Sequence, residues 1–374
     1  MRLRALGFGF GIGWLLAACA SPEPSSAAPP PEVPPVDAES AGLGRAVYAT
    51  HCALCHGATG EGYVADHAPA LSNPDFLDAA SDAYLRAAIE EGRPGTPMSS
   101  WASSRGGPLS EADIDGIIAF MRSWATTAPI DLTHVSVSGR RELGETAFQT
   151  RCAACHGTQG EGITAPQLRN PVFLRTASVG YIRYTIEHGR RGTPMVAFGD
   201  TLDSATIDDV TSYVRALVPG ATTPAVPMGG PPPDLDHLVM NPEGPDPGFE
   251  LREDRFVAGR AVREAMERSA RMVILDARAP TDWGRSHVRG AAPFPFYDVD
   301  TLAAHLPTDG TWIIAYCACP HAASGHLVDE LRRRGFTHTA ILDEGIPWWI
   351  EQGYPVEAGP IPVGAAAIPE ALPH

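Results

Sequence analysis

Residues 52–57 read CALCHG, and residues 152–157 read CAACHG. In each stretch two cysteines stand three positions apart, and a histidine directly follows the second. Residues three and four positions apart share one face of a helix, so both thiols can reach the vinyl groups of one haem while the histidine binds its iron. The pattern predicts two covalently attached haem c groups. Their attachment residues and first iron ligands are Cys52, Cys55, His56, Cys152, Cys155 and His156.

The chain around these motifs is an internal duplication. Gly-Glu-Gly follows both motifs, at residues 60–62 and 160–162, and Gly-Thr-Pro-Met follows later, at residues 95–98 and 192–195. A methionine after proline can present its thioether from a loop. Met98 and Met195 are therefore the predicted second iron ligands.

Two alternatives to this assignment stay open. The methionines can instead fill gaps in a core, as methionine often does, with His67 or His188 as the ligand. Zinc in place of haem would need a further cysteine or histidine in each copy, and neither copy contains another cysteine. Histidine and methionine together saturate the iron and raise the haem potential, which suits electron transfer rather than oxygen chemistry.

Residues 40–219 resemble class I cytochrome c domains in tandem. Beyond the motifs, the resemblance rests on a first helix that carries Gly44 and Tyr48 in one copy and Gly144 and Phe148 in the other. In this family that helix crosses a closing helix over the haem. Apolar residues at helical spacing fit a closing helix in each copy, at Ile114, Ile117, Ile118, Met121, Ile207, Val210, Val214 and Leu217.

The resemblance implies a small all-α fold for each haem, with exposed haem edges. We expect one such domain at residues 40–128 and the second at residues 137–219. It also implies that electrons pass between periplasmic donors and acceptors, which are the expected partners.

Composition excludes several function classes. The chain has 374 residues and a formal net charge of −16, so it lacks the basic surface that nucleic-acid binding requires. The 28 basic residues include no lysine, which excludes Schiff-base chemistry. The 36 prolines and 38 glycines indicate long connectors between packed domains.

The N-terminus reads as an export signal with a lipid attachment site. Residues 1–18 hold two arginines and then an apolar run that is too short to span a bilayer. The sequence around Cys19 resembles a bacterial lipoprotein signal, which implies lipidation of Cys19. Residues 19–39 form a Pro/Ala/Ser-rich tether. We expect a lipid anchor on the periplasmic face of a bacterial membrane, with the outer membrane favoured; the alternative is an ordinary cleaved signal.

Residues 220–249 are rich in proline and glycine and predict a semi-rigid linker. The sequence pattern changes after this linker. Residues 250–358 alternate helical segments with buried-strand runs at 272–275 and 312–316, which predicts an α/β domain with a parallel sheet. Residues 359–374 form a tail.

The α/β segment resembles rhodanese domains. Asp276-Ala277-Arg278 and the stretch 286–291 match the opening pattern of the family, with Ser286 in place of the usual glycine. Cys317 follows the second strand, where the family carries its sulfur-accepting cysteine. The loop after it lacks the arginine that is common in the family. A thiol facing loop amides and a helix N-terminus has its thiolate stabilised, so Cys317 is a candidate catalytic residue.

Cys319 admits three interpretations: a thiol that attacks a persulfide on Cys317, a disulfide partner, or a buried bystander. The domain itself can handle persulfides, bind without catalysis, or act as a dithiol switch.

The sequence thus predicts a multidomain chain, with two all-α cytochrome c domains followed by one α/β rhodanese-like domain with a parallel sheet. Two functions remain. In the first, a membrane-tethered dihaem cytochrome c carries electrons between redox partners. In the second, Cys317 accepts sulfane sulfur as a persulfide, and electrons from its oxidation pass to the haems.

Overall fold

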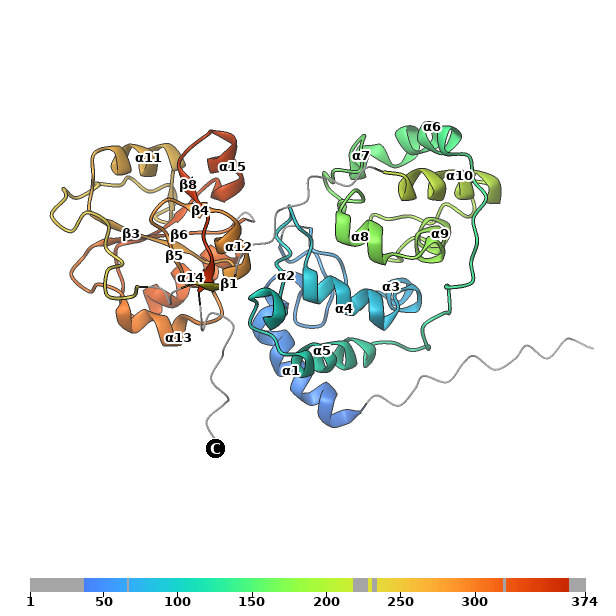
Figure 1. Cartoon of the computed structure of the whole chain (residues 1–374), viewed down its shortest axis with the longest axis horizontal. Coiled ribbons are helices and arrows are strands. Elements are labelled where there is room, and N and C mark those ends of the chain that lie inside the picture. The colour runs from blue at the N-terminus through green and yellow to red at the C-terminus, as the bar shows by residue number, and fades with distance from the viewer. Residues whose placement is uncertain (1–36, 66, 218–227, 231–233, 319–320, 363–374) are drawn as a thin grey trace, which may run out of the picture.

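The computed structural model describes residues 37–65, 67–217, 228–230, 234–318 and 321–362 (Figure 1). Two helical units are followed by an α/β unit, and Figure 1 shows the α/β unit beside the first helical unit. The predicted fold class is confirmed. Among the described residues no helix is long and apolar enough to cross a membrane.

The first helical unit begins with a long helix that leads directly into the first Cys-x-x-Cys-His motif. Side-chain oxygens of Asp37, Asn73, Ser81 and Ser110 cap its longer helices, as N-cap residues do. Its elements are α1 (Ala38–His51), α2 (Ala53–His56), α3 (Pro74–Ala79), α4 (Asp82–Glu91), η1 (Ser103–Arg105) and α5 (Glu111–Arg122).

The second helical unit repeats this order in its α-helices. Asn170, Ser178 and Asp203 occupy the matching N-cap positions. Its elements are α6 (Arg141–Arg151), α7 (Ala153–His156), α8 (Pro171–Thr176), α9 (Val179–His188) and α10 (Ser204–Arg215). The predicted apolar stripes of the closing helices α5 and α10 are buried, as expected of core faces.

Each unit is closed by a crossing of its first and last helices, at a glycine. A Cβ atom on Gly44 would lie 1.8 Å from the carbonyl oxygen of Gly116, and one on Gly144 would lie 2.0 Å from that of Asp209. No side chain fits at either position, so glycine permits the close approach of α1 to α5 and of α6 to α10.

The two helical units pack against each other through equivalent surfaces. Helix α3 contacts α9 while α4 contacts α8, so each copy offers the same pair of helices. The Nδ2 of Asn73 donates to the Arg191 carbonyl at 2.8 Å, and the equivalent Asn170 donates to the Pro94 carbonyl at 3.0 Å. The rings of Tyr84 and Tyr181, also equivalent, lie 4.7 Å apart. Such reciprocal contacts are those of a two-fold interface between subunits, here built within one chain.

The α/β unit is built on a five-stranded parallel sheet of order β2-β7-β6-β3-β5. The expected strands are present as β3 (Met272–Asp276) and β6 (Trp312–Tyr316), which are almost wholly buried because helices cover both faces. The other strands of the unit are β2 (Phe256–Val257), β4 (His287–Val288), β5 (Ala292–Pro293), β7 (Thr339–Leu342) and β8 (Val356–Glu357). Its helices are α11 (Gly259–Glu267), α12 (Pro280–Arg285), α13 (Val299–Leu302), η2 (Ala303–His305), α14 (Ala322–Arg333) and α15 (Gly345–Glu351).

Parts of the segments predicted as linker and tail pack on the α/β unit. Strand β1 (Met228–Gly230) pairs with β9 (Ile361–Pro362), and Met240 pairs with Met272 at the start of β3. These pairings could not be predicted from the sequence. The paired strands are only two or three residues long and lie in segments rich in proline and glycine, so no alternating apolar pattern marks them.

The α/β unit also contacts the first helical unit. Ile361 packs on Gly106, whose φ of 86° turns the chain there. The rings of His51 and Tyr297 lie 4.8 Å apart. Helix α14 touches α2, the short helix of the first motif.

Candidate functional site

Both Cys-x-x-Cys-His motifs adopt the same backbone. The first cysteine of each motif separates two helices, with φ of −114° at Cys52 and −117° at Cys152. The histidine is the last residue of the second helix. Gly57 and Gly157 follow with φ of 83°, a conformation that favours glycine. The two motifs are therefore alike in backbone conformation as well as in sequence.

The histidines are held by one nitrogen each. The Nδ1 of His56 lies 2.9 Å from the Pro69 carbonyl, and that of His156 lies 2.9 Å from the Pro166 carbonyl. Burial lowers the pKa of both imidazoles, against the carbonyl contact, which raises it. A neutral ring whose Nδ1–H donates to a carbonyl presents the lone pair of Nε2, and metal-bound histidines are commonly fixed in this way.

The methionine loops are built alike in both units. The amide of Arg93 donates to the carbonyl of Met98 at 2.8 Å, and the amide of Arg190 donates to that of Met195 at 2.7 Å. The hydroxyls of Thr96 and Thr193 accept from the two methionine amides at 3.2 Å. Each methionine thus sits in a closed turn and is half-buried, with Met98 packed against the core.

The alternative iron ligands, His67 and His188, are more exposed than the methionines. His67 is exposed, and the side chain of His188 is 49% exposed, 3.8 Å from Glu187 and against the ring of Tyr184. Burial and then Cys55 raise the pKa of Cys52 to about 12, and burial and then Cys155 raise that of Cys152 to about 11, so both thiols are neutral in this structure. In the part of the chain that the structure describes, no three His, Cys, Asp or Glu residues converge on one point.

The candidate sulfur site lies where β6 ends. Cys317 is 2% exposed, and its Sγ lies 3.2 Å from Oγ of Ser324 in α14. His321 precedes α14 with a φ of 75°, and its Nε2 contacts Asp343 at 2.6 Å from the carbonyl and 3.2 Å from the carboxylate. Ser324 was not singled out in the sequence, because one serine among the residues of a helix carries no signal. Cys319 and Cys19 lie outside the described residues.

Family models match most of the described chain. Residues 39–121 and 140–214 match the model described as "Cytochrome C oxidase, cbb3-type, subunit III", and residues 260–352 match the rhodanese-like domain. This chain contains two cytochrome c domains and a rhodanese-like domain. The first and second cytochrome c domains are the two helical units, and the rhodanese-like domain is the α/β unit.

Known proteins resemble the cytochrome part. The Cbb3-type cytochrome c oxidase subunit FixP of Azorhizobium caulinodans is 31% identical over 46% of this chain and 58% of its own length. The subunit CcoP of an Azospirillum species is 30% identical over 46% of this chain and 61% of its own length. A chain of the reducing HAO-like protein complex of Kuenenia stuttgartiensis aligns with 50% of this chain and 99% of its own at 19% identity, with a TM-score of 0.35. This chain thus spans about three fifths of the length of the two curated relatives.

Cytochrome c domains bind haem c covalently. The residues of both domains fit such a group: each offers two thiols beside a neutral imidazole that presents Nε2, and a thioether in a closed turn. Tyr48 supports the first motif, because its hydroxyl donates to the Gly57 carbonyl at 2.9 Å. Phe148 has no hydroxyl at the equivalent position, so the second motif lacks this bond.

Proposed function

We propose that the chain is a lipid-anchored periplasmic cytochrome that carries two haem c groups and passes electrons between redox partners. The observation that supports this most directly is the duplicated ligand frame. Each domain fixes a histidine through Nδ1 and encloses a methionine in a hydrogen-bonded turn. A haem so bound has no open position on its iron, which suits the transfer of single electrons.

The packing of the two domains supports a relay between them. Pro94 and Arg191 belong to the methionine loops, and their carbonyls accept from Asn170 and Asn73 of the opposite domain. Both ligand loops therefore lie at the domain interface. The named relatives are oxidase subunits, which supports the exchange of electrons with other haem proteins.

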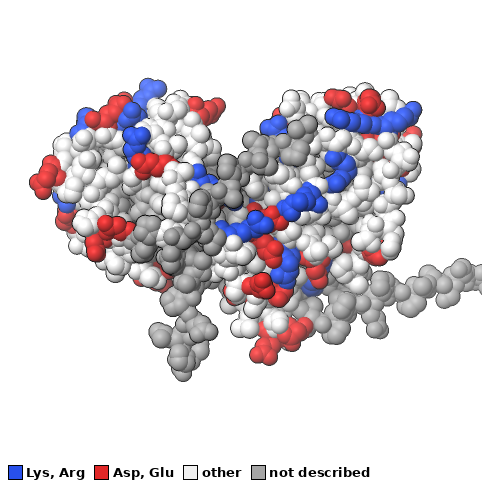
Figure 2. Space-filling view, viewed as in Figure 1, with Lys and Arg blue, Asp and Glu red and all other residues white. Residues whose placement is uncertain are grey.

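The surface of the cytochrome part carries both positive and negative side chains, which favours redox partners whose own surfaces carry both signs of charge. Although the net charge is −16, Figure 2 shows arginines and acidic residues interleaved on the visible face of the cytochrome part. Glu91, for example, pairs with Arg105 at 3.1 Å and with Arg175 of the second domain at 2.6 Å.

Counting haem groups tests the proposal. The denatured, reduced protein should show two haem c groups per chain. The double change Cys52→Ala with Cys55→Ala and the double change Cys152→Ala with Cys155→Ala should each leave one. A redox titration of the unmodified protein should then resolve two one-electron steps. One haem in the unmodified protein would reject the proposal.

Membrane attachment is tested separately. The unmodified protein should sediment with membranes and take up a labelled fatty acid, whereas Cys19→Ser should do neither. If the unmodified protein is released as a soluble periplasmic protein, the ordinary signal peptide is the right interpretation.

A sulfur reaction at Cys317 is the second candidate. The observation that favours it is that α14, which provides Ser324 beside Cys317, also contacts α2 of the first haem motif. In the first step the Cys317 thiolate takes sulfane sulfur from a persulfide donor and releases the donor thiolate. In the second step the Cys317 persulfide and a thiol couple oxidatively to a trisulfide, with loss of two protons and two electrons. His56 with Met98 and His156 with Met195 would hold the haems that accept these electrons, one each.

Anaerobic absorption spectra separate the two candidates. Persulfide donor and thiol are added to the oxidised protein, beside the variant Cys317→Ser. Haem reduction that the variant lacks supports the sulfur reaction. Equal responses, or none, leave the chain a carrier with an accessory rhodanese-like domain. The same comparison with Cys319→Ser shows whether the second cysteine takes part.

A further inference from the structure

The segment after the iron-ligating methionine differs between the two cytochrome c domains. In the first domain Met98 is followed by Ser99 and Ser100, which are 5% and 1% exposed. In the second domain Met195 is followed by Val196, which is 58% exposed, and by Ala197, which is also exposed. The bonds that enclose the two methionines are the same, but the residues after them differ. Ser100 Oγ donates to the Glu91 carbonyl of its own domain at 2.7 Å, and further contacts with Ser99 and Ser100 come from outside the first domain.

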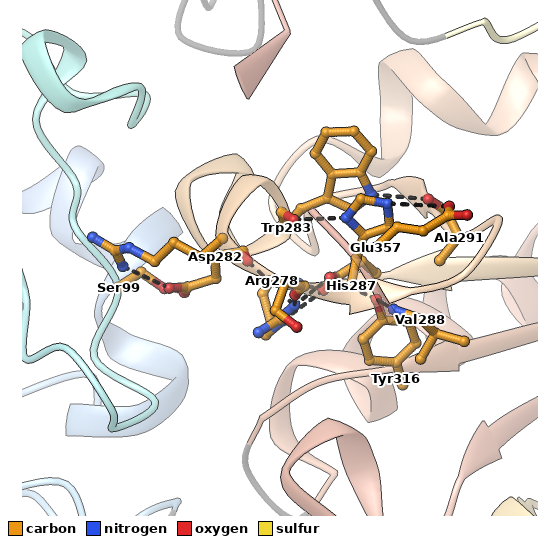
Figure 3. Close-up of polar contacts among 12 residues, drawn as sticks. Ser99, Arg278, Asp282, Trp283, His287, Val288, Ala291, Tyr316 and Glu357 are labelled. Atoms are coloured by element: carbon orange, nitrogen blue, oxygen red, sulfur yellow. Dashed lines mark hydrogen bonds and ion pairs between the residues drawn. The ribbon is translucent and has the colours of Figure 1, made fainter. Parts of the chain in front are cut away.

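These outside contacts come from helix α12 of the rhodanese-like domain. Ser99 Oγ donates to Oδ2 of Asp282 at 2.5 Å (Figure 3). The Thr281 hydroxyl donates to the Ser100 carbonyl at 3.2 Å, and Nη2 of Arg285 donates to Oγ of Ser100 at 3.0 Å. All three partners lie within the single helix α12, and all three bonds end on the two residues that follow Met98.

Helix α12 is itself fixed by a buried polar network. Arg278 pairs with Asp276 at 2.6 Å and donates to the Ser286 carbonyl at 2.6 Å, just beyond the end of α12. Asp276 is wholly buried and also accepts from the Tyr316 hydroxyl at 2.8 Å. Asp282 pairs with Arg285 at 3.0 Å within the helix. Buried networks whose members are all paired hold one geometry, so α12 is a rigid support.

We propose that Thr281, Asp282 and Arg285 are positioning residues for the methionine ligand of the first haem, so that the rhodanese-like domain supports the residues after one methionine and not those after the other. The proposal rests on the proposed function, in which Met98 and Met195 ligate iron. An external ligand can replace a methionine only if its loop opens. At the first haem, opening breaks the three bonds to α12 as well as those within the loop.

Displacement of methionine by imidazole tests this proposal on the oxidised full-length protein. The far-red absorption band of methionine-ligated ferric haem disappears as imidazole binds. The variants Met98→Ala and Met195→Ala each remove the band of one haem, which assigns the two phases of the titration. We expect the α12 contacts to raise the imidazole concentration needed at the first haem about tenfold, since a hydrogen bond to a charged group contributes about a factor of ten or more. The second loop is tied to the first domain by Arg191 and Asp75 at 2.9 Å and gives the phase that changes in α12 should leave unaltered.

The variants Ser99→Ala and Arg285→Gln should lower the imidazole concentration needed at the first haem about fivefold to tenfold. Neither should change the second haem. Arg285→Lys retains a donor and should have a smaller effect. Arg289→Gln is the matched control, because Arg289 is on the same domain but its side chain is 60% exposed and 3.5 Å from Glu357; it should change neither phase.

Two results would overturn the proposal: no shift at the first haem in either variant, or equal shifts at both haems, which indicate general loosening. Failure of the proposed function looks different. In that case the band is missing from the unmodified protein, or it survives in full in Met98→Ala and in Met195→Ala.

Discussion

The two cytochrome c domains hold their ligand residues in the same way but have different neighbours. Their motifs, capped helices, histidine contacts and methionine turns repeat with nearly equal distances. Their surroundings differ: the first domain lies against the rhodanese-like domain through its methionine loop and through His51, whereas Val196 and Arg151 of the second domain are exposed at the equivalent positions. The duplication has kept the contacts of the histidine and methionine ligands. Differences between the two haem sites therefore come from the Tyr48 hydroxyl, which Phe148 lacks, and from what surrounds each domain.

The largest expected effect is a loss of stability in one cytochrome c domain that leaves the other unchanged. Gly44→Ala places a Cβ atom 1.8 Å from a backbone oxygen of α5, so α1 and α5 must separate. We expect the first domain to lose roughly 3 kcal/mol or more of unfolding free energy, because the obstacle is backbone that cannot rotate away. Gly144→Ala should do the same to the second domain. Urea unfolding, followed by the far-red haem band, measures both.

Gly42→Ala is the control for this prediction. Gly42 is an exposed residue of the same helix, and a Cβ atom added there would have nothing within 4 Å. Alanine there should stabilise α1 by about 0.5–1 kcal/mol. Equal losses in Gly42→Ala and Gly44→Ala would show that the helix crossing is not the cause.

A smaller effect is expected at the interface of the two cytochrome c domains, where changing one asparagine should destabilise both domains. Asn73→Ser keeps a side-chain acceptor for the N-cap of α3 but loses the donor to the Arg191 carbonyl, and Asn170→Ser likewise leaves the Pro94 carbonyl without its donor. Each should cost about 1 kcal/mol, since a part-buried carbonyl loses its donor. Asn170→Ser should cost more, because Asn170 is 0% exposed and Asn73 is 7% exposed.

An interface role for these asparagines is recognised by which domain loses unfolding free energy. Asn73→Ser should lower the stability of the second domain as well as its own, and Asn170→Ser the reverse. The double variant should cost less than the sum of the two, because one interface is being opened. Losses confined to the mutated domain would show that these asparagines act only as helix caps.

Most of the fold could be predicted from the sequence, and the contacts between domains could not. The stripes of α5 and α10 and the strands β3 and β6 follow local periodicity, which a sequence displays directly. Asn73 and Asn170 were visible as repeated residues, yet their role across the interface depends on how two finished domains pack. Ser99 and Asp282 are 183 positions apart, and neither residue type signals the other.

The smallest expected effect is a pH dependence in the first domain alone. His51 is 6% exposed between Trp101 and Tyr297, and burial lowers its pKa, against the Val47 carbonyl and the charge of Asp113, which raise it. Its Nε2 has no hydrogen-bond partner among the described residues. The folded state therefore binds this proton less readily than the unfolded state, whose histidine has a pKa of about 6.5.

Because the folded pKa is the lower one, the stability that neutral His51 provides is complete above about pH 6.5 and declines as the pH falls toward the folded pKa. We expect the urea midpoint of the first domain to fall between about pH 7.5 and about pH 5.5, and His51→Phe, which keeps an aromatic ring without a titrating group, to remove that part of the fall. The second domain carries Arg151 at this position, exposed to solvent, and should lack the dependence. An equal fall in both domains, or one that persists in His51→Phe, would assign the effect to other groups, and the methionine loop rather than His51 would then be the contact through which the rhodanese-like domain distinguishes the two haem sites.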